Sequence, residues 1–328
     1  MTEYHLIMAK HHVVLLLMLV SLTASAQYQL ANGDFERWEK VTYTSSKTCD
    51  EPVAWSSFYD ATGGHKKIGT SSKSQIHKEK EKRPGSPGRF SCLLTSRSVF
   101  GVVAQGTVTS GCMNMGSLSA SDAGGNYNYI NEERSDQAMR FSGHPDAVRF
   151  WVRFSGEDTA VMRVFLTSKG YFQDPAYKDR NKATLVAQAL SDNRIVSNDK
   201  WTKYTIPFDW KTSETDPYYA LVEFSTSAEP GKGSADDYLY VDDVEMIYNS
   251  EATSVLYDGR NILQAGKVAE KFNPAKMGKI TTNARAAKAS WKYDGAACRL
   301  IVTVEGENIK ENNTNKHVYH IQFSQAKH

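Results

Sequence analysis

The chain has 328 residues, a formal net charge of +2, and 40% hydrophobic residues. This length and apolar content are sufficient for two domains with hydrophobic cores. Basic and acidic residues are mixed along the chain, which argues against nucleic acid as a partner. Runs of helix-favouring residues are scarce, whereas valine, threonine, tyrosine and phenylalanine are frequent, so the composition predicts an all-β protein.

The N-terminus has the pattern of a secretion signal. An apolar core over residues 13–22 is followed by Ala24-Ser25-Ala26, which fits the cleavage rule of signal peptidase. The sequence therefore predicts a signal peptide over residues 1–26 and an exported protein of the periplasm or cell surface. The apolar run is shorter than the ~20 residues of a membrane-spanning helix, so we expect no transmembrane segment.

The chain contains four cysteines, Cys49, Cys92, Cys112 and Cys298, and no Cys-x-x-Cys motif. Their spacing fits no zinc site. Export permits disulfides, so one bridge among the first three cysteines is one expectation. Buried free thiols are the alternative.

Several segments alternate between apolar and polar residues, as half-buried strands do. The clearest covers residues 147–154, where Val148 and every second residue after it face one side. Arg149, Trp151 and Arg153 face the other side. Further strands are expected at residues 159–167, 201–208, 218–224 and 238–248.

Polar segments between these strands are expected to be loops, notably residues 117–136 and 171–180. Residues 183–190 fit either a short helix or an edge strand. Many strands with polar, glycine-rich connections predict a jelly-roll β-sandwich over residues 27–249.

The strand pattern restarts after residue 250 and continues to the C-terminus. Short strands are expected at residues 254–259, 289–293, 300–304 and 318–323. Their number and spacing suit a small immunoglobulin-like β-sandwich over residues 250–328.

Two segments about two hundred residues apart resemble the first and last strands of carbohydrate-binding jelly rolls: residues 32–38 (NGDFERW) and 238–247 (YLYVDDVEMI). With Trp55, the FSGHP segment at 141–145 and Trp151, they resemble the carbohydrate metabolism domain family of secreted Bacteroidetes jelly-roll proteins. Residues 304–308 and 319–323 resemble the immunoglobulin-like modules found beside that domain. The resemblance implies a role in glycan handling within a polysaccharide-use system and names no reaction.

Carboxylates on the first and last predicted strands suggest a structural calcium site. Calcium takes six to eight oxygen ligands, including carboxylates and backbone carbonyls. Glu36 and either Asp242 or Asp243 are the candidate ligands. The alternative is that these acids cap the sheet edge and contact water or lysine.

Polar and aromatic residues on the central strands predict a sugar-binding surface on the concave face of the jelly roll. An aromatic ring stacks on the C–H face of a sugar, while charged and amide groups bond its hydroxyls. Trp151 would stack on the ring, and the other candidates are Arg149, Arg153, Arg163, Lys203, Glu223, Asn126, Tyr127 and Tyr129. The alternative is an ordinary solvated face with local ion pairs.

The sequence thus predicts an exported, non-catalytic protein that binds an oligosaccharide or polysaccharide. One rival is a jelly-roll glycoside hydrolase that uses Glu223 and a second acid. The other is a structural or adhesive surface protein, which would present an exposed apolar patch or sheet edge. An outer-membrane or surface protein is a further expected partner.

Overall fold

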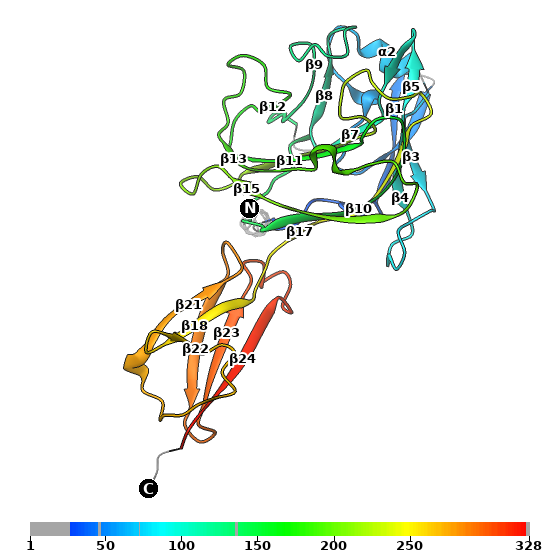
Figure 1. Cartoon of the computed structure of the whole chain (residues 1–328). Coiled ribbons are helices and arrows are strands. Elements are labelled where there is room, and N and C mark those ends of the chain that lie inside the picture. Colours follow the sequence, from blue (N-terminus) through cyan, green and yellow to red (C-terminus); the bar gives the residue numbers. More distant parts are fainter. Residues whose placement is uncertain (1–26, 45–46, 72, 135–136, 326–328) are drawn as a thin grey trace, which may run out of the picture.

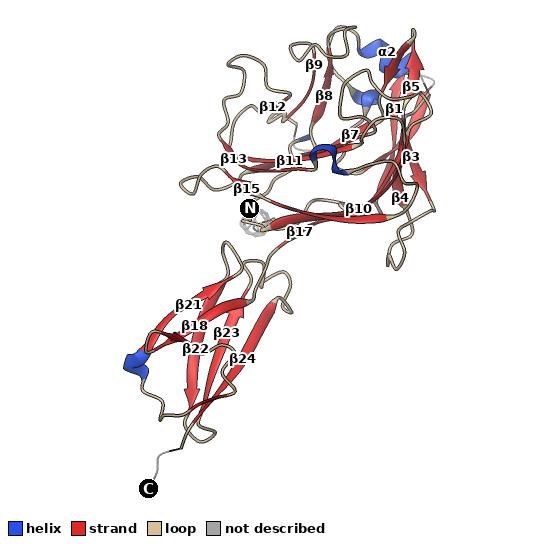
Figure 2. Cartoon of the chain, in the orientation of Figure 1, coloured by secondary structure: helices blue, strands red, loops and turns tan. Residues whose placement is uncertain are grey.

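The computed structural model describes residues 27–44, 47–71, 73–134 and 137–325. Strands dominate these residues, and the helical segments are short (Figure 2). The all-β prediction is therefore confirmed. No helix within the described ranges is both long and apolar enough to cross a membrane. The predicted signal peptide lies outside the described residues.

Two five-stranded antiparallel sheets form the larger domain. The first, which we call the β10 sheet, contains in order β14 (Thr202–Pro207), β10 (Ala147–Ser155), β17 (Tyr238–Ile247), β4 (Ser91–Thr95) and β3 (Ile76–Glu79). The second, the β11 sheet, contains β15 (Asp209–Trp210), β13 (Leu185–Leu190), β11 (Val161–Thr167), β16 (Tyr219–Ser225) and β7 (Thr107–Thr109). The strand orders β4-β17-β10-β14 and β7-β16-β11-β13 are those of an eight-stranded jelly roll.

The core of this domain lies between the two sheets (Figure 1). On β10, Phe150 and Phe154 are buried in the core, whereas Arg149 and Arg153 on the opposite face are half-buried. The period-two prediction for this strand is confirmed, and the strands expected at 159–167, 201–208, 218–224 and 238–248 are also present. Residues 185–190 form β13 inside the β11 sheet, so a strand rather than a helix occupies this segment.

Three small sheets and short helical segments complete the domain. The sheet β8 (Cys112–Met115), β9 (Asn126–Tyr129) and β12 (Gln173–Asp174) lies over the outer face of the β11 sheet (Figure 1). Phe165 and Leu221 pack beneath it in a second cluster. The remaining elements are β1 (Trp38–Thr44) with β2 (Lys47–Pro52), β5 (Arg97–Val99) with β6 (Val102–Ala104), η1 (Phe58–Asp60), α2 (Lys66–Ser71) and η3 (Asp192–Arg194). The segments 117–136 and 171–180 thus contain strands, and the prediction that they are loops alone was wrong.

Residues 32–37 form a turn rather than the predicted first strand. The side chain of Asn32 donates hydrogen bonds to the carbonyls of Arg37 (2.9 Å) and Val53 (3.0 Å), which closes the turn. The neighbours of β17 within its sheet are β10 and β4. The turn still lies against β17, because the Val244 N–H donates to the Gly33 carbonyl at 2.8 Å.

The C-terminal strands form a small β-sandwich of their own. One sheet contains β19 (Arg260–Asn261), β18 (Ala252–Tyr257) and β21 (Met277–Thr282). The other contains β20 (Lys267–Val268), β24 (Lys316–Phe323), β23 (Arg299–Glu305) and β22 (Lys288–Asp294), and η4 (Pro274–Lys276) precedes β21. Its core, which includes Val255, Val302 and Phe323, shares no residue with the jelly-roll core. Its likeness to immunoglobulin modules stays a prediction.

None of the four cysteines forms a disulfide, so the expected bridge was wrong. Cys49, Cys92 and Cys112 lie on β2, β4 and β8, which belong to three different sheets. The Cys112 thiol instead donates a hydrogen bond to the side-chain amide oxygen of Gln137. Burial raises the pKa of Cys112 to about 11, so its thiol stays protonated at neutral pH.

Candidate functional site

The predicted sugar-binding residues fall on opposite outer faces of the sandwich. Arg149, Trp151, Arg153 and Lys203 lie on the β10 sheet, whereas Arg163 and Glu223 lie on the β11 sheet. The core separates the two groups, so the prediction that they share one surface was wrong. Each sheet presents one group to the outside because alternate residues of its strands fill the core.

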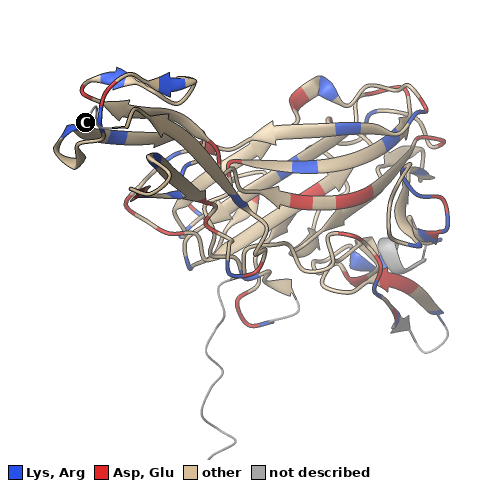
Figure 3. Ribbon diagram, turned by 90° about the horizontal axis from the view of Figure 1, so that it is seen from below, with Lys and Arg blue, Asp and Glu red and all other residues tan. Residues whose placement is uncertain are grey.

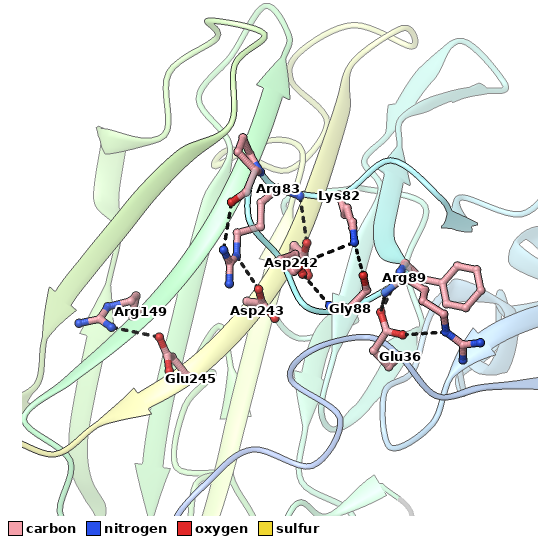
Figure 4. Close-up of polar contacts among 12 residues, drawn as sticks. Glu36, Lys82, Arg83, Gly88, Arg89, Arg149, Asp242, Asp243 and Glu245 are labelled. Carbon is pink, nitrogen blue, oxygen red and sulfur yellow. Dashed lines mark hydrogen bonds and ion pairs between the residues drawn. The ribbon is translucent and has the colours of Figure 1, made fainter. Parts of the chain in front are cut away.

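On the β10 sheet, the two predicted arginines form ion pairs with neighbouring acids. Arg149 pairs with Glu245 across the strands at 3.2 Å (Figure 4). Arg153 pairs with Glu81 and, at 2.7 Å, with Asp199. Basic and acidic residues alternate over this face, which Figure 3 views from below.

Two cations lie near the Trp151 ring on the same face. The Arg83 guanidinium carbon is 5.3 Å from the ring centroid, and the Lys203 ammonium is 5.8 Å away. Both distances are within the range of cation–π attraction. A sugar that stacks on Trp151 would therefore compete with these side chains, and the stacking role stays a prediction.

On the opposite side, a pocket of about 680 Å³ lies between the β11 sheet, the β8/β9/β12 sheet and the β5/β6 hairpin. Its volume is typical of small-molecule sites. Much of its wall is apolar, formed by Phe58, Ile68, Val99, Val103, Met113 and Met115. Phe100, Val102 and Leu118 also line it and are 87%, 45% and 64% exposed, so part of the apolar lining faces solvent.

One end of the pocket carries a polar cluster of Arg163, Asp174 and Glu223. A guanidinium nitrogen of Arg163 lies 3.7 Å from a carboxylate oxygen of Asp174 and 3.7 Å from one of Glu223. Both distances exceed the usual 2.7–3.2 Å of a hydrogen bond. Arg163 therefore supplies one positive charge to the two acids without close contact to either.

The two acids are buried and interact with one another. Burial and then the charge of Asp174 raise the pKa of Glu223 well above its usual range. Burial also raises the pKa of Asp174, although Arg163 and a hydrogen bond with Glu223 oppose the shift. The Oε1 atom of Glu223 is buried and has no hydrogen-bond partner among the described residues. Ionisation of Glu223 is therefore disfavoured while Asp174 is ionised.

The β9 strand supplies the remaining predicted residues. Asn126 and Tyr127 line the pocket beside Asn128, whereas Tyr129 is outside its lining. The Tyr129 hydroxyl is instead 3.2 Å from the Thr62 hydroxyl. The structure thus brings Arg163, Glu223, Asn126 and Tyr127 to one site.

Sequence reasoning missed Asp174 and the apolar wall. Asp174 lies in the segment 171–180 that was expected to be a loop, and its pairing with Asn128 through β12 is a long-range feature. The hydrophobic periodicity of helices and strands does not predict such a contact between distant segments. The one available signal was the charge of Asp174 beside Tyr171 and Tyr177 in the same loop.

The three predicted calcium ligands contact basic groups and backbone amides (Figure 4). Glu36 accepts hydrogen bonds from the amides of Arg89 and Phe90 at 2.6 and 2.7 Å. Asp243 pairs with the Arg83 side chain at 2.5 Å, and Asp242 accepts from the Arg83 amide at 3.1 Å.

One carboxylate oxygen, Oδ1 of Asp242, is buried without a partner among the described residues. It would suit a cation, but calcium requires several more oxygens. The nearby Lys82 ammonium already donates to the carbonyls of Ser86 (3.1 Å) and Gly88. Within the described ranges, no three or more His, Cys, Asp or Glu side chains are grouped to hold a metal. The calcium site stays a prediction.

No family model and no curated protein matches the chain. Among solved structures, it is similar to the enzymatically active domain of tailspike protein 4 of bacteriophage CBA120, with 11% identity and a TM-score of 0.32, over 66% of this chain and 21% of that one. It is also similar to a carbohydrate-binding module of the β-sandwich superfamily, with 12% identity and a TM-score of 0.27, over 52% of each chain. A structure described as CBM4 matches with 15% identity and a TM-score of 0.26, over 65% of this chain and 96% of that one.

The chain thus spans about a fifth of the tailspike domain and about half of the first carbohydrate-binding module. Similarity at this level supports no conclusion about ligands. The jelly-roll assignment rests on the strand order, and the functional argument rests on the pocket.

Proposed function

We propose that this chain is an exported, non-catalytic glycan-binding protein whose sugar occupies the pocket on the β11 sheet. The observation that supports this is the pairing of an apolar wall with the incompletely bonded cluster of Arg163, Asp174 and Glu223. A sugar presents a C–H face to such a wall and a hydroxyl edge to such a cluster. Neighbouring hydroxyls would accept from Arg163 and donate to Asp174.

The acid pair fits binding better than glycoside hydrolysis. Hydrolysis requires two carboxyl groups ~5–5.5 Å apart for retention, or ~6.5–9.5 Å apart for inversion. One guanidinium nitrogen of Arg163 lies 3.7 Å from each acid, and the Glu223 side chain is only 3% exposed. A glycosidic oxygen would therefore have poor access to Glu223, which the rival mechanism requires as one of its two acids.

The predicted location in the periplasm or at the cell surface and the role in polysaccharide use belong to the same proposal. So does a structural calcium ion near Asp242. The C-terminal sandwich would act as a spacer or as the docking site for a surface protein.

The test is titration of residues 27–328 with a broad panel of polysaccharides and oligosaccharides. Hydrogen bonds to a charged group contribute about 1.5–3 kcal/mol, so Arg163→Ala should weaken binding by about ten- to a hundredfold. Tyr127→Ala should also weaken it, because Tyr127 lines the pocket. Arg149→Ala is the matched control on the opposite sheet and should bind as the parent does.

Trp151→Ala distinguishes the two faces of the sandwich. Unchanged affinity for this variant would support the pocket. Loss of binding in Trp151→Ala with full binding in Arg163→Ala would place the sugar on the β10 sheet and refute the pocket. A folded protein that binds no member of the panel would refute glycan binding itself.

A further inference from the structure

Within the described ranges, two acids and one arginine line the pocket, and its remaining basic residue is His65. Arg163 is the only lysine or arginine among the described residues that line it, and it faces both Asp174 and Glu223. If both acids are ionised, one negative charge remains without a counter-charge in a largely apolar cavity. Such a charge is costly to bury unless a proton or a bound cation neutralises it.

The cluster also has an unused hydrogen-bond acceptor, which a ligand with a donor group could satisfy. Glu223 Oε1 is buried and lacks a partner among the described residues, so an acceptor is unused. Arg163 is 3.5 Å from the Ala228 carbonyl and 3.7 Å from each acid, so its guanidinium group makes no close hydrogen bond to either acid. A ligand that brings both a donor and a positive charge would satisfy the cluster better than a neutral hydroxyl.

We propose that the pocket takes an aminated glycan, with a protonated amino group of the sugar against Asp174 and the ring against the apolar wall. This inference rests on the proposed function and specifies its ligand class. Asp174 is the contact residue because its side chain is 19% exposed, whereas that of Glu223 is 3% exposed. Glu223 lies behind it and supplies the second negative charge.

Binding of the amino group should displace a proton. In the free protein, a proton on Glu223 would offset the one negative charge that Arg163 leaves uncompensated. When the ammonium group arrives, Glu223 loses that proton to the buffer, and the net charge of the cluster with its ligand is unchanged. A neutral sugar would leave the proton in place.

The experiment compares oligomers of equal length made of glucosamine, N-acetylglucosamine or glucose, by isothermal titration calorimetry of residues 27–328. At about pH 5.5 the amino group is charged and a free carboxyl group is ionised. We expect the glucosamine oligomer to bind at least about tenfold more tightly, a difference of about 1.4 kcal/mol. Its heat should change between buffers of different ionisation enthalpy, as release of about one proton requires.

Two variants test the residues, and a third is the control. Glu223→Gln and Asp174→Asn should each abolish the preference for the amino sugar and the proton release. Circular dichroism is recorded for both variants, and one folded variant is sufficient for the test. Glu245→Gln removes an acid from the opposite sheet face, where it pairs with Arg149, and should retain the preference.

Equal affinity for the three oligomers, or a preference that survives in a folded Glu223→Gln or Asp174→Asn, would refute the inference. Binding of neutral glycans alone would refute it while leaving the proposed function intact. A folded protein that binds no glycan at all would refute both.

Discussion

His144 joins the two domains through both nitrogens of its imidazole ring. Nδ1 is 2.8 Å from a Glu307 carboxylate oxygen of the C-terminal domain, and Nε2 is 3.1 Å from Asp216 of the jelly roll. Both partners are acceptors, so both nitrogens must donate, which only the protonated imidazolium does. The ring also stacks on Trp210 at 5.4 Å, and Arg285 of the C-terminal domain lies 4.0 Å from the same indole.

The charge on His144 should make the domain junction sensitive to pH. The hydrogen bond to Glu307, with the nearby charges, raises the pKa of His144 above its usual value despite partial burial. The stabilisation is therefore complete below the undocked pKa of about 6.5 and is lost as the pH rises through the higher docked pKa. His144→Gln keeps one donor and removes the charge, so it should weaken docking at low pH.

The size of the effect follows from the contacts. A hydrogen bond to a charged group is worth about 1.5–3 kcal/mol. The His144 side chain is 24% exposed, so the lower end applies, and His144→Gln should lower the ratio of docked to undocked molecules about tenfold. The other ionisable groups that face this junction include Asp146, Glu311 and Tyr248, whose own titration must be separated from that of His144.

Energy transfer between a donor dye on the jelly roll and an acceptor on the C-terminal domain measures the docking. The parent should show a narrower distance distribution at about pH 6 than at about pH 9, and His144→Gln should be broad at both. His320→Gln changes an exposed histidine on β24 and is the matched control. Identical distributions at both pH values in the parent, or an unchanged pH dependence in His144→Gln, would refute the reasoning.

Three further predictions concern the reactivity of the thiols, the ionisation of Asp242 and the turn at Gly33. A thiol reagent should label the half-buried Cys298 before the buried Cys112, whose pKa is raised by burial to about 11; equal rates would contradict this. Burial raises the pKa of Asp242 to about 7, so its ionised form costs stability at alkaline pH, and this cost fades as the pH falls toward the unfolded pKa of about 3.9. Asp242→Asn should therefore raise the free energy of unfolding in urea by about 1–3 kcal/mol at alkaline pH and little near pH 4; destabilisation at both would overturn the account. In Gly33→Ala, the new Cβ would lie 2.2 Å from the Val244 carbonyl oxygen. We therefore expect the free energy of unfolding to fall by about 1–3 kcal/mol in the same assay. An unchanged unfolding midpoint would contradict this, because it would show that the turn shifts without cost.

The sequence predicted the strands whose two faces have different environments. On β10, one face is in the core and the other meets solvent and ion pairs, so residues 147–154 alternate clearly. On β9, all four residues are half-buried, so no alternation distinguishes this strand from the surrounding loop. Residues 32–37 form a turn because the Asn32 side chain bonds to the backbone of Arg37. The resemblance of this segment to a first strand does not reveal such a contact.

The site was predicted only in part for a related reason. The strand pattern placed Glu223 on a polar face, but the β8/β9/β12 sheet covers this face and every residue of β16 is buried. The pairing of Glu223 with Asp174 and Arg163 depends on segments far apart in the chain. Alternation reports which way a side chain points, and it does not report what covers it.

The most direct test of the pocket is hydrogen–deuterium exchange of residues 27–328 with and without a saturating glycan from the panel. The account predicts slower exchange at the amides of residues 99–104 and 126–128, which line the pocket. Residues 149–153 and 202–205 on the opposite sheet should exchange at an unchanged rate. Protection of residues 149–153 in place of 126–128 would contradict the central claim and assign the sugar to the Trp151 face.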